Sequence, residues 1–298
     1  MGERFLSRAW RKRLALGLPT VLGLRPRGWF LPHRHADEAR PPATYAALQP
    51  LFAAAEPAFR AWLEDFAPWR EAFAAIAADR GQGAARWNQH WFPRLDAASL
   101  YAAARRRRPR RVVEVGSGHS TRFLLRALDD ACLDCAVTAI DPAPRATLAA
   151  AAASRAGLTL LRTTLQAAGL APFAELAAGD LLLIDSSHLL MPGSDVDLLF
   201  AEVLPRLPAG VLVQVHDIFL PDGYPPDWAW RGYNEQQGLV GWLASGRLAL
   251  RFSSHYAATR LAAAVAASAV GGIALEPGAR ETALWLETAG APVALTGF

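Results

Sequence analysis

The 298-residue sequence predicts a doubly wound α/β fold with a mostly parallel seven-stranded sheet and an N-terminal helical extension. Two observations predict it. Across residues 110–290, short apolar runs of strand length alternate with helix-length segments, the pattern of a parallel sheet covered by helices on both faces. The first run ends in a glycine-rich turn that opens a helix, which is typical of folds that bind a nucleotide at their strand ends.

Residues 1–45 form a basic segment that prolines and glycines interrupt. Its apolar run Leu14–Leu24 follows several basic residues and so mimics a secretory signal, but Arg25-Pro26-Arg27 stands where a small-residue cleavage site would be. No uninterrupted apolar run reaches the roughly 18 residues of a membrane-spanning helix. We therefore expect a cytoplasmic protein whose basic N-terminus covers the domain or makes weak contact with the inner membrane face.

Residues 46–108 predict a helical cap, because apolar residues recur at spacings of three and four in Tyr45–Ala55 and Ala58–Ala78. The second stretch carries an aromatic stripe that we expect to be core: Trp62, Phe66, Trp69 and Phe73. The basic run Arg105–Arg111 has no interleaved aromatic residues, so we expect a solvated face and no nucleic-acid partner.

Residues 109–298 form the predicted α/β domain. The expected strands are Arg111–Val115, Ala136–Ile140, Leu158–Arg162, Asp180–Ile184, Val211–Val215, Leu248–Ser254 and Ala283–Glu287. The expected helices are Ser120–Leu128, Arg145–Arg155, Leu165–Leu176, Asp195–Leu204 and Tyr233–Ala244. The last two strands lack a long helix between them, which predicts one unusual sheet edge. The lone pair Cys132 and Cys135 cannot complete a four-ligand zinc site, so we expect structural thiols in a reducing compartment.

The turn Gly116–Gly118 has the composition of a nucleotide-binding turn. Its glycines allow a ligand to approach the backbone, and the helix that Ser120 opens has free N–H groups. The glycine pattern of a dinucleotide-binding turn requires a third glycine at the position that Thr121 occupies. Glu114, at the strand end, would repel a pyrophosphate and suits a cation such as the sulfonium of S-adenosylmethionine. We therefore expect this cofactor to contact Glu114, Gly116, Ser117, Gly118 and Ser120.

The second predicted strand ends in Asp141. A carboxylate at this position accepts hydrogen bonds from ribose hydroxyls in nucleoside-binding folds. The alternative is an N-cap for the helix near Arg145. We expect the ribose role.

Five segments carry a further resemblance: Trp87–Asp96, Glu114–Thr121, Ile140–Pro142, Ile184–His188 and Val215–Phe219. Together they resemble the class I S-adenosylmethionine-dependent methyltransferases, most of all the bacterial subgroup known as methyltransferase domain 24, over roughly residues 87–256. The resemblance implies a seven-stranded sheet, methyl transfer, and a cofactor held by Glu114, Gly116, Gly118 and Asp141, with Pro142 beside them. It also implies that the segment Trp87–Asp96 closes over the cofactor, with Asp96 and Tyr101 as secondary contacts.

Polar residues follow the fourth and fifth predicted strands, where a ligand of an open α/β sheet is expected. Asp185 and His188 follow the fourth strand, and His216 and Asp217 follow the fifth. We expect Asp185, His188 and His216 to be catalytic, with a histidine as general base, and Asp185 to reach the cofactor as well. Each histidine could instead be a hydrogen-bonded spacer between loops.

A divalent metal held by Asp185 and Asp217, with imidazole nitrogens nearby, is the alternative. Catechol-type methyltransferases and cephalosporin hydroxylase-like proteins look similar here. The catechol type, however, has an Asp-Asn pair after the fifth strand, where this chain has His216-Asp217.

The loop Leu220–Trp230 is rich in proline, glycine and aromatic residues and is a candidate lid. We expect a methyltransferase that acts on oxygen or nitrogen of a small-molecule or glycan-type acceptor. The alternatives are a metal-dependent oxygenase-like member of the same fold, a NAD-dependent oxidoreductase, and a binding module without activity. The oligomeric state is open.

Overall fold

The computed structural model describes residues 8–29, 31–81, 83–144, 148 and 155–290. They fall into two compact units. The larger is Thr44–Gly223 with Tyr233–Phe298, and the smaller is Met1–Ala43 with Tyr224–Gly232. The larger unit holds both the helices expected as a cap and the expected α/β domain. The predicted boundaries near residues 45 and 108 stay predictions.

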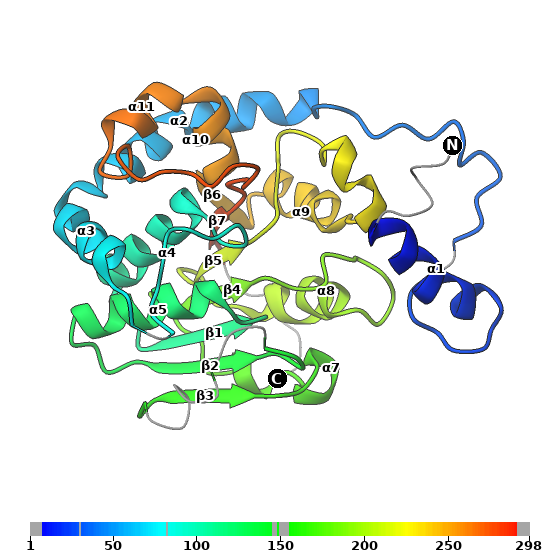
Figure 1. Cartoon of the computed structure of the whole chain (residues 1–298), viewed down its shortest axis with the longest axis horizontal. Helices are drawn as coiled ribbons and strands as arrows, with labels where there is room; N and C mark the ends of the chain where they lie inside the picture. Colours follow the sequence, from blue (N-terminus) through cyan, green and yellow to red (C-terminus); the bar gives the residue numbers. More distant parts are fainter. Residues whose placement is uncertain (1–7, 30, 82, 145–147, 149–154, 291–298) are drawn as a thin grey trace. The chain divides into compact units, whose positions relative to one another are not determined.

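A seven-stranded sheet in the order β3-β2-β1-β4-β5-β7-β6 forms the centre of the larger unit (Figure 1). Its strands are β1 Arg111–Val115, β2 Ala136–Ile140, β3 Leu158–Leu161, β4 Leu181–Ile184, β5 Leu212–Val215, β6 Leu248–Ser253 and β7 Leu284–Thr288. The first five are parallel, and only β7 runs antiparallel to its two neighbours. The predicted doubly wound sheet is therefore confirmed.

The chain reverses its direction of winding at β1, which lies between β2 and β4. Open α/β sheets bind ligands beyond the carboxyl ends of the strands at such a point. The predicted unusual edge is the antiparallel pair of β6 and β7, whose register shifts between Leu250 and Phe252.

The helices of the larger unit include α2 Gln49–Glu64, α3 Arg70–Ala78, α4 Arg94–Arg107, α5 His119–Asp130, α7 Leu165–Ala168, α8 Asp195–Leu198, α9 Glu235–Ala244, α10 Ser254–Arg260 and α11 Ala262–Ala267. The helix expected over Leu165–Leu176 is wrong in length. It ends at Ala168 because Gly169 follows with a positive φ of 70°. The helix expected over Arg145–Arg155 lies almost wholly outside the described residues. The smaller unit contains α1 Arg8–Val21.

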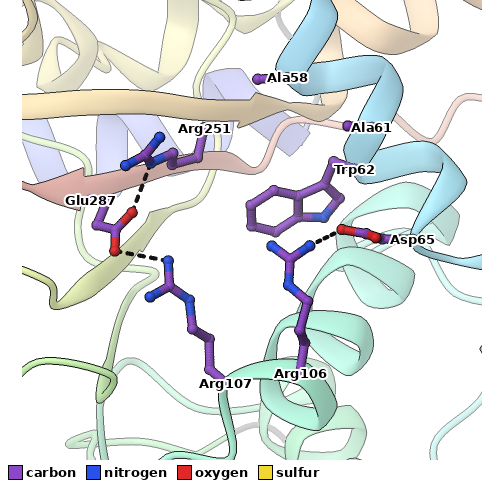
Figure 2. Close-up of a pocket in the computed structure, with 8 residues that line it drawn as sticks. All are labelled: Ala58, Ala61, Trp62, Asp65, Arg106, Arg107, Arg251 and Glu287. Atoms are coloured by element: carbon purple, nitrogen blue, oxygen red, sulfur yellow. Dashed lines mark hydrogen bonds and ion pairs between the residues drawn. The ribbon is translucent and has the colours of Figure 1, made fainter.

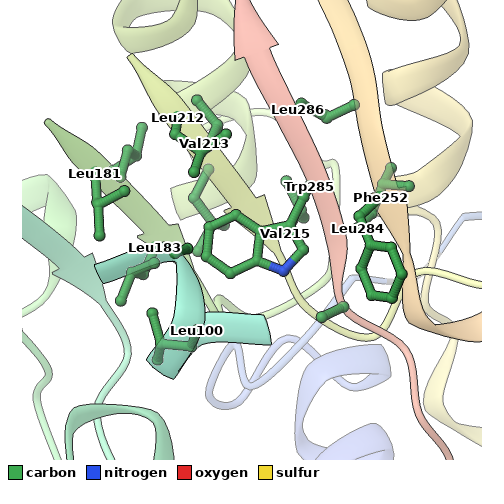
Figure 3. Packing of buried hydrophobic residues seen from close by; sticks show 14 of the residues in the cluster. Leu100, Leu181, Leu183, Leu212, Val213, Val215, Phe252, Leu284, Trp285 and Leu286 are labelled. Carbon is green, nitrogen blue, oxygen red and sulfur yellow. The ribbon is translucent and has the colours of Figure 1, made fainter. Parts of the chain in front are cut away.

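The apolar core packs against the sheet and includes residues of the helices before β1 and of those after it. Figure 3 shows the part around Trp285. Trp285 of β7 is 0% exposed, packs beside leucines and valines of β4 and β5, and donates from its indole nitrogen to the Ser99 hydroxyl at 2.8 Å. Trp62 of the predicted aromatic stripe stacks on Phe252 of β6 at 5.6 Å. Three of the four stripe residues are buried, and Trp69 is partly buried. The stripe is therefore core, as predicted.

Tyr101 also belongs to the core. It is 0% exposed, and its hydroxyl donates to Asp130 at 2.6 Å. Tyr101 is therefore held within the core, and its expected secondary contact with the cofactor stays a prediction. In the described part of the chain, no helix is long and apolar enough to cross a membrane.

Candidate active site

The turn after β1 is shaped by two glycines with different roles. Gly116 has a φ of 83°, and a Cβ atom there would lie 2.1 Å from the carbonyl oxygen of Asp185. No other residue fits. The amide of Asp185 donates to the carbonyl of Val115 at 2.8 Å, so the exits of β1 and β4 are joined. A Cβ atom at Gly118, in contrast, would meet nothing within 4 Å. The backbone there faces open space that a ligand can fill.

Glu114 lies beneath this turn and supports it. The side chain is 1% exposed, and its two oxygens accept hydrogen bonds from Ser120 Oγ and Thr121 Oγ1, both at 2.6 Å. Thr121 Oγ1 in turn accepts from the amide of Gly118 at 3.0 Å. Burial raises the pKa of Glu114 to about 7, against the effect of the two hydroxyls. Because these oxygens are engaged, the direct cofactor contacts expected of Glu114 and Ser120 stay predictions.

Asp141, at the end of β2, faces the same turn. Its carboxylate accepts from the Ser117 amide at 2.9 Å, the Ser117 hydroxyl at 2.8 Å and the Ala143 amide at 2.8 Å. A carboxylate offers about four acceptor sites, so two ribose hydroxyls would displace the Ser117 hydroxyl. Pro142 is exposed beside it. The alternative N-cap near Arg145 lies outside the described residues.

The four polar residues predicted after β4 and β5 come together. His188 Nε2 lies 3.3 Å from Asp185 Oδ1 and 3.6 Å from Asp217 Oδ2. His216 Nδ1 lies 3.7 Å from Asp185 Oδ1 and 3.5 Å from Asp217 Oδ1. The two imidazoles thus share two carboxylates. The Asp185 side chain is 43% exposed, against 5% for that of His188 and 6% for that of His216, so it is the group that a substrate can reach.

Each imidazole is also held from behind by a buried carboxylate. His188 Nδ1 pairs with Glu235 Oε2 at 2.9 Å, at the start of α9. His216 Nε2 pairs with Asp96 Oδ2 at 3.1 Å, in the first turn of α4. Both acids are 0% exposed. Sequence reasoning missed these pairings, because an acidic residue in the first turn of a helix is too common a feature to reveal them.

The electrostatics of the cluster decide its protonation. Burial alone would lower the pKa of both histidines, but the surrounding carboxylates outweigh burial and raise it well above the ordinary value. The two imidazoles hold the pKa of Asp185 well below its usual range, against the opposing effect of burial. Near neutral pH the imidazoles are therefore protonated and Asp185 is ionised. A histidine can act as the expected general base only in the fraction that has lost its proton.

The backbone of the cluster is strained. His188 has a φ of 61° and Asp217 a φ of 58°, and both are non-glycine residues in the left-handed region. Such a conformation costs about 1–3 kcal/mol and is concentrated at functional sites. The amides of Asn234 and Glu235 hold the His188 carbonyl at 3.1 and 3.3 Å. Other interactions of the fold must therefore offset the free energy that these two backbone conformations cost.

No group of three or more His, Cys, Asp or Glu side chains in the described residues meets the geometry of a metal site. The metal expected on Asp185 and Asp217 stays a prediction. Most of the expected lid Leu220–Trp230, from Tyr224 on, belongs to the smaller unit, so the lid stays a prediction as well.

A cavity of about 340 Å³ lies at the other end of the sheet (Figure 2). It is lined by Ala58, Ala61, Trp62, Asp65, Arg106, Arg107, Arg251 and Glu287. Glu287 pairs with Leu212, the first residue of β5, so this cavity is at the amino ends of the parallel strands. The candidate site is at their carboxyl ends.

A sequence model of a protein family described as a methyltransferase domain matches residues 113–218. Residues 113–218 are thus similar to this methyltransferase family. The match runs from β1 through β5 and includes the glycine turn and all four residues of the polar cluster. It confirms the resemblance to the class I methyltransferases and the prediction of a methyltransferase enzyme.

Solved structures give weaker similarities. An apo structure of CmcI is 18% identical, with a TM-score of 0.38 over 66% of this chain and 71% of that one. The SAH-bound methyltransferase PaMTH1 of Podospora anserina is 17% identical, with a TM-score of 0.37 over 75% and 93%. A Mg-SAM structure of CmcI is 16% identical, with a TM-score of 0.36 over 64% and 69%. Among curated proteins, none matches this chain. At these TM-scores the likenesses carry no further argument.

Proposed function

We propose that this domain transfers the methyl group of S-adenosylmethionine to oxygen or nitrogen of a small-molecule or glycan-type acceptor. One observation supports the proposal above the others. The close contact between Gly116 and the Asp185 carbonyl places two features at neighbouring strand ends. They are the turn Gly116–Gly118, here called the donor turn, and the polar cluster of Asp185, His188, His216 and Asp217. S-adenosylmethionine bound at the donor turn and a methyl acceptor bound at Asp185 would therefore be adjacent.

The residues of the turn fit this cofactor. Gly118 leaves open space over the backbone, and Asp141 offers a carboxylate to ribose hydroxyls. The ionised Asp185 would attract the positive charges of the cofactor's amino and sulfonium groups. When bound, the cofactor supplies an electrophilic methyl group on a cationic sulfur.

The same turn argues against a dinucleotide. A pyrophosphate binds to free backbone N–H groups at the start of a helix. Here the Ser117 amide is taken by Asp141 and the Gly118 amide by Thr121. The NAD-dependent alternative would have to break both hydrogen bonds.

For the reaction, Asp185 accepts a hydrogen bond from the O–H or N–H group of the methyl acceptor. This bond orients the lone pair of that oxygen or nitrogen towards the methyl carbon. With the cofactor bound, the oxygen or nitrogen of the methyl acceptor would take its methyl group, and S-adenosylhomocysteine would be released. The acceptor's proton passes through Asp185 to a neutral imidazole, at His188 Nε2 or His216 Nδ1, both of which face Asp185. Glu235 and Asp96 keep each ring in place.

Calorimetric titration tests the proposal. S-adenosylmethionine and S-adenosylhomocysteine should bind to the wild-type protein, and Asp141→Ala should weaken both by at least about tenfold, since it removes charge-assisted hydrogen bonds. Asp134→Ala, at an exposed acid, is the control and should change neither. Unchanged affinity in Asp141→Ala would remove the ribose assignment, and tighter binding of NADH than of either ligand would favour the oxidoreductase.

One observation favours the metal-dependent alternative. In each histidine, the ring nitrogen that faces away from Asp185 is hydrogen-bonded to a buried carboxylate. The same arrangement orients imidazoles that bind metals. If a metal is present, Asp185 and Asp217 would hold it and it would lower the pKa of an acceptor hydroxyl. Elemental analysis of the purified wild-type protein and of the Asp217→Asn variant decides whether a metal is bound. A stoichiometric metal lost in the variant supports the alternative, and no metal in the wild-type protein rejects it.

The smaller unit supports a peripheral contact with the inner membrane face of a cytoplasmic protein. In α1, Leu14, Leu18 and Val21 are 42%, 49% and 58% exposed, and basic residues precede them. Exposed apolar side chains beside Arg and Lys are typical of helices that lie on anionic lipid. Co-sedimentation with anionic vesicles at low salt should be measurable and should fall as salt rises; its absence at low salt would end this idea.

A further inference from the structure

The loop before α4 is built to expose a tryptophan. Gln89 is only 3% exposed, and its side-chain oxygen Oε1 accepts hydrogen bonds from the backbone amides of Trp91 at 2.9 Å and Phe92 at 2.7 Å. Its amide nitrogen donates to the carbonyl of Phe92. These bonds fix the backbone of the loop, yet Trp91 is 57% exposed. The exposure of Trp91 is therefore set by an ordered loop.

Trp91 adjoins both halves of the candidate site. Its indole stacks on the imidazole of His119 with 5.8 Å between centroids and 9° between planes, and His119 directly follows Gly118 of the donor turn. Burial, with smaller effects of Arg122 and Arg86, lowers the pKa of His119 to about 4, so this ring is neutral. The neighbouring Phe92 packs on His216 of the polar cluster at 5.3 Å.

We propose that Trp91 is the platform on which a ring of the methyl acceptor stacks. Indole faces bind flat aromatic rings and cationic groups, and they offer a large apolar surface to a sugar ring. A ring on Trp91 would lie beside the donor turn, with its hydroxyl or amine directed to the Asp185 cluster. This inference rests on the proposed function.

The charge of the cluster narrows the acceptor further. Four carboxylates meet two imidazoles there: Asp96, Asp185, Asp217 and Glu235 with His188 and His216. Acidic side chains thus outnumber the imidazoles in the cluster. The acceptor ring is therefore neutral or cationic, and an anionic ring is repelled.

Three probes test the platform by ligand-observed NMR and calorimetry on the protein loaded with S-adenosylhomocysteine. Dopamine and protocatechuate share a dihydroxyphenyl ring but carry opposite charges, and methyl glucoside represents sugars. Dopamine or methyl glucoside should bind, and protocatechuate should bind more weakly than dopamine. Trp91→Ala should weaken the bound probe by about 3- to 10-fold, and Trp91→Phe should keep most of the binding. Trp29→Ala, at another exposed tryptophan, should have no effect.

The outcomes separate the possible roles. Probe binding that is equal in Trp91→Ala and wild type, or no binding of any probe, overturns the platform. A Trp91→Ala variant that loses affinity for S-adenosylhomocysteine as strongly as for the probe overturns it too, because Trp91 would then serve the cofactor. If the wild-type protein binds no S-adenosylhomocysteine, the proposed function fails, and the same probe series on the unloaded protein decides the platform by itself.

Discussion

The two ends of the central sheet both carry networks of charged side chains, but these networks differ in kind. At the amino ends, each oxygen of Glu287 meets one guanidinium, from Arg107 at 2.8 Å and from Arg251 at 2.7 Å. At the carboxyl ends, Asp185 and Asp217 are each shared between His188 and His216. The first network is paired within itself. The second has carboxylates in excess and leaves Asp185 partly open to solvent.

Left-handed non-glycine residues occur at both ends, since Arg108, the C-cap of α4, has a φ of 49°. Arg106 and Arg107 lie in the last turn of α4, where cations are favoured by the helix dipole, and their long side chains reach the cavity. At the carboxyl ends, His188 and Asp217 adopt left-handed conformations that cost energy. Backbone strain alone therefore does not separate the two ends, whereas carboxylates shared between histidines are found at the carboxyl ends.

The largest expected effect is on catalysis at the carboxyl ends. Asp185→Asn removes the charge and the proton acceptor that an acceptor molecule would meet, so methyl transfer should fall by about 10²–10⁴-fold. Glu287→Gln, at the amino ends, should leave the rate unchanged. The release of S-adenosylhomocysteine, with an acceptor that the wild-type protein methylates, measures both. Equal losses in the two variants would erase the contrast between the two ends.

The next effect separates the two glycines of the turn. Gly116→Ala places a Cβ atom against the Asp185 carbonyl at a positive φ, so it should destabilise the fold by about 3 kcal/mol or more. Gly118→Ala meets no atom and should leave the melting temperature nearly unchanged, while the methyl group obstructs the cofactor and weakens S-adenosylhomocysteine. Calorimetry reads both quantities. A stable Gly116→Ala variant would contradict the close approach.

A smaller effect concerns the titration of His188. NMR of labelled histidine should show a pKa above its ordinary value, and Glu235→Gln should lower the pKa of His188 while leaving that of His216 less changed. Because the pKa is raised in the folded state, this pairing stabilises the protein below the ordinary histidine pKa, and the stabilisation is lost as pH rises through the raised pKa. Methyl transfer should rise over the same interval. A His188 that titrates at or below its ordinary pKa would contradict the proposed relay.

The smallest effect is expected at the amino ends. Glu287→Gln leaves Arg107 and Arg251 without their shared carboxylate and should cost about 1 kcal/mol of stability, less at high salt. Binding of S-adenosylhomocysteine should not change. Chemical denaturation at two salt concentrations measures the loss. A marked loss of cofactor affinity would show that the two ends are coupled.

Much of this could be predicted from the sequence. Alternating apolar segments predicted the sheet, and the residues at the strand ends predicted that Asp185, His188, His216 and Asp217 would meet, because the carboxyl ends of parallel strands lie at one edge. The glycine turn was predicted as well, and the family match over residues 113–218 confirms the enzyme class.

The remaining features depend on tertiary contacts that no local pattern encodes. Glu235 and Asp96 reach their histidines across 47 and 120 positions of sequence. The two oxygens of Glu114 accept hydrogen bonds from Ser120 and Thr121 at the start of α5, and its expected contact with a cationic cofactor stays a prediction. The helix over Leu165–Leu176 was wrong because the positive φ of Gly169 outweighs the apolar spacing around it.

Asp96 ties together parts of the chain that are made at very different times. Besides its contact with His216, the Asp96 carboxylate accepts hydrogen bonds from the backbone amides of Thr282 and Ala283, which lie just before β7. A growing chain that has completed β5 already contains the whole glycine turn and His216, but the carboxylate behind His216 is not yet fixed. The cluster can acquire its final arrangement only when the residues before β7 have left the ribosome. A shortened chain without Thr282, Ala283 and β7 should therefore lose the arrangement of His216 along with a strand.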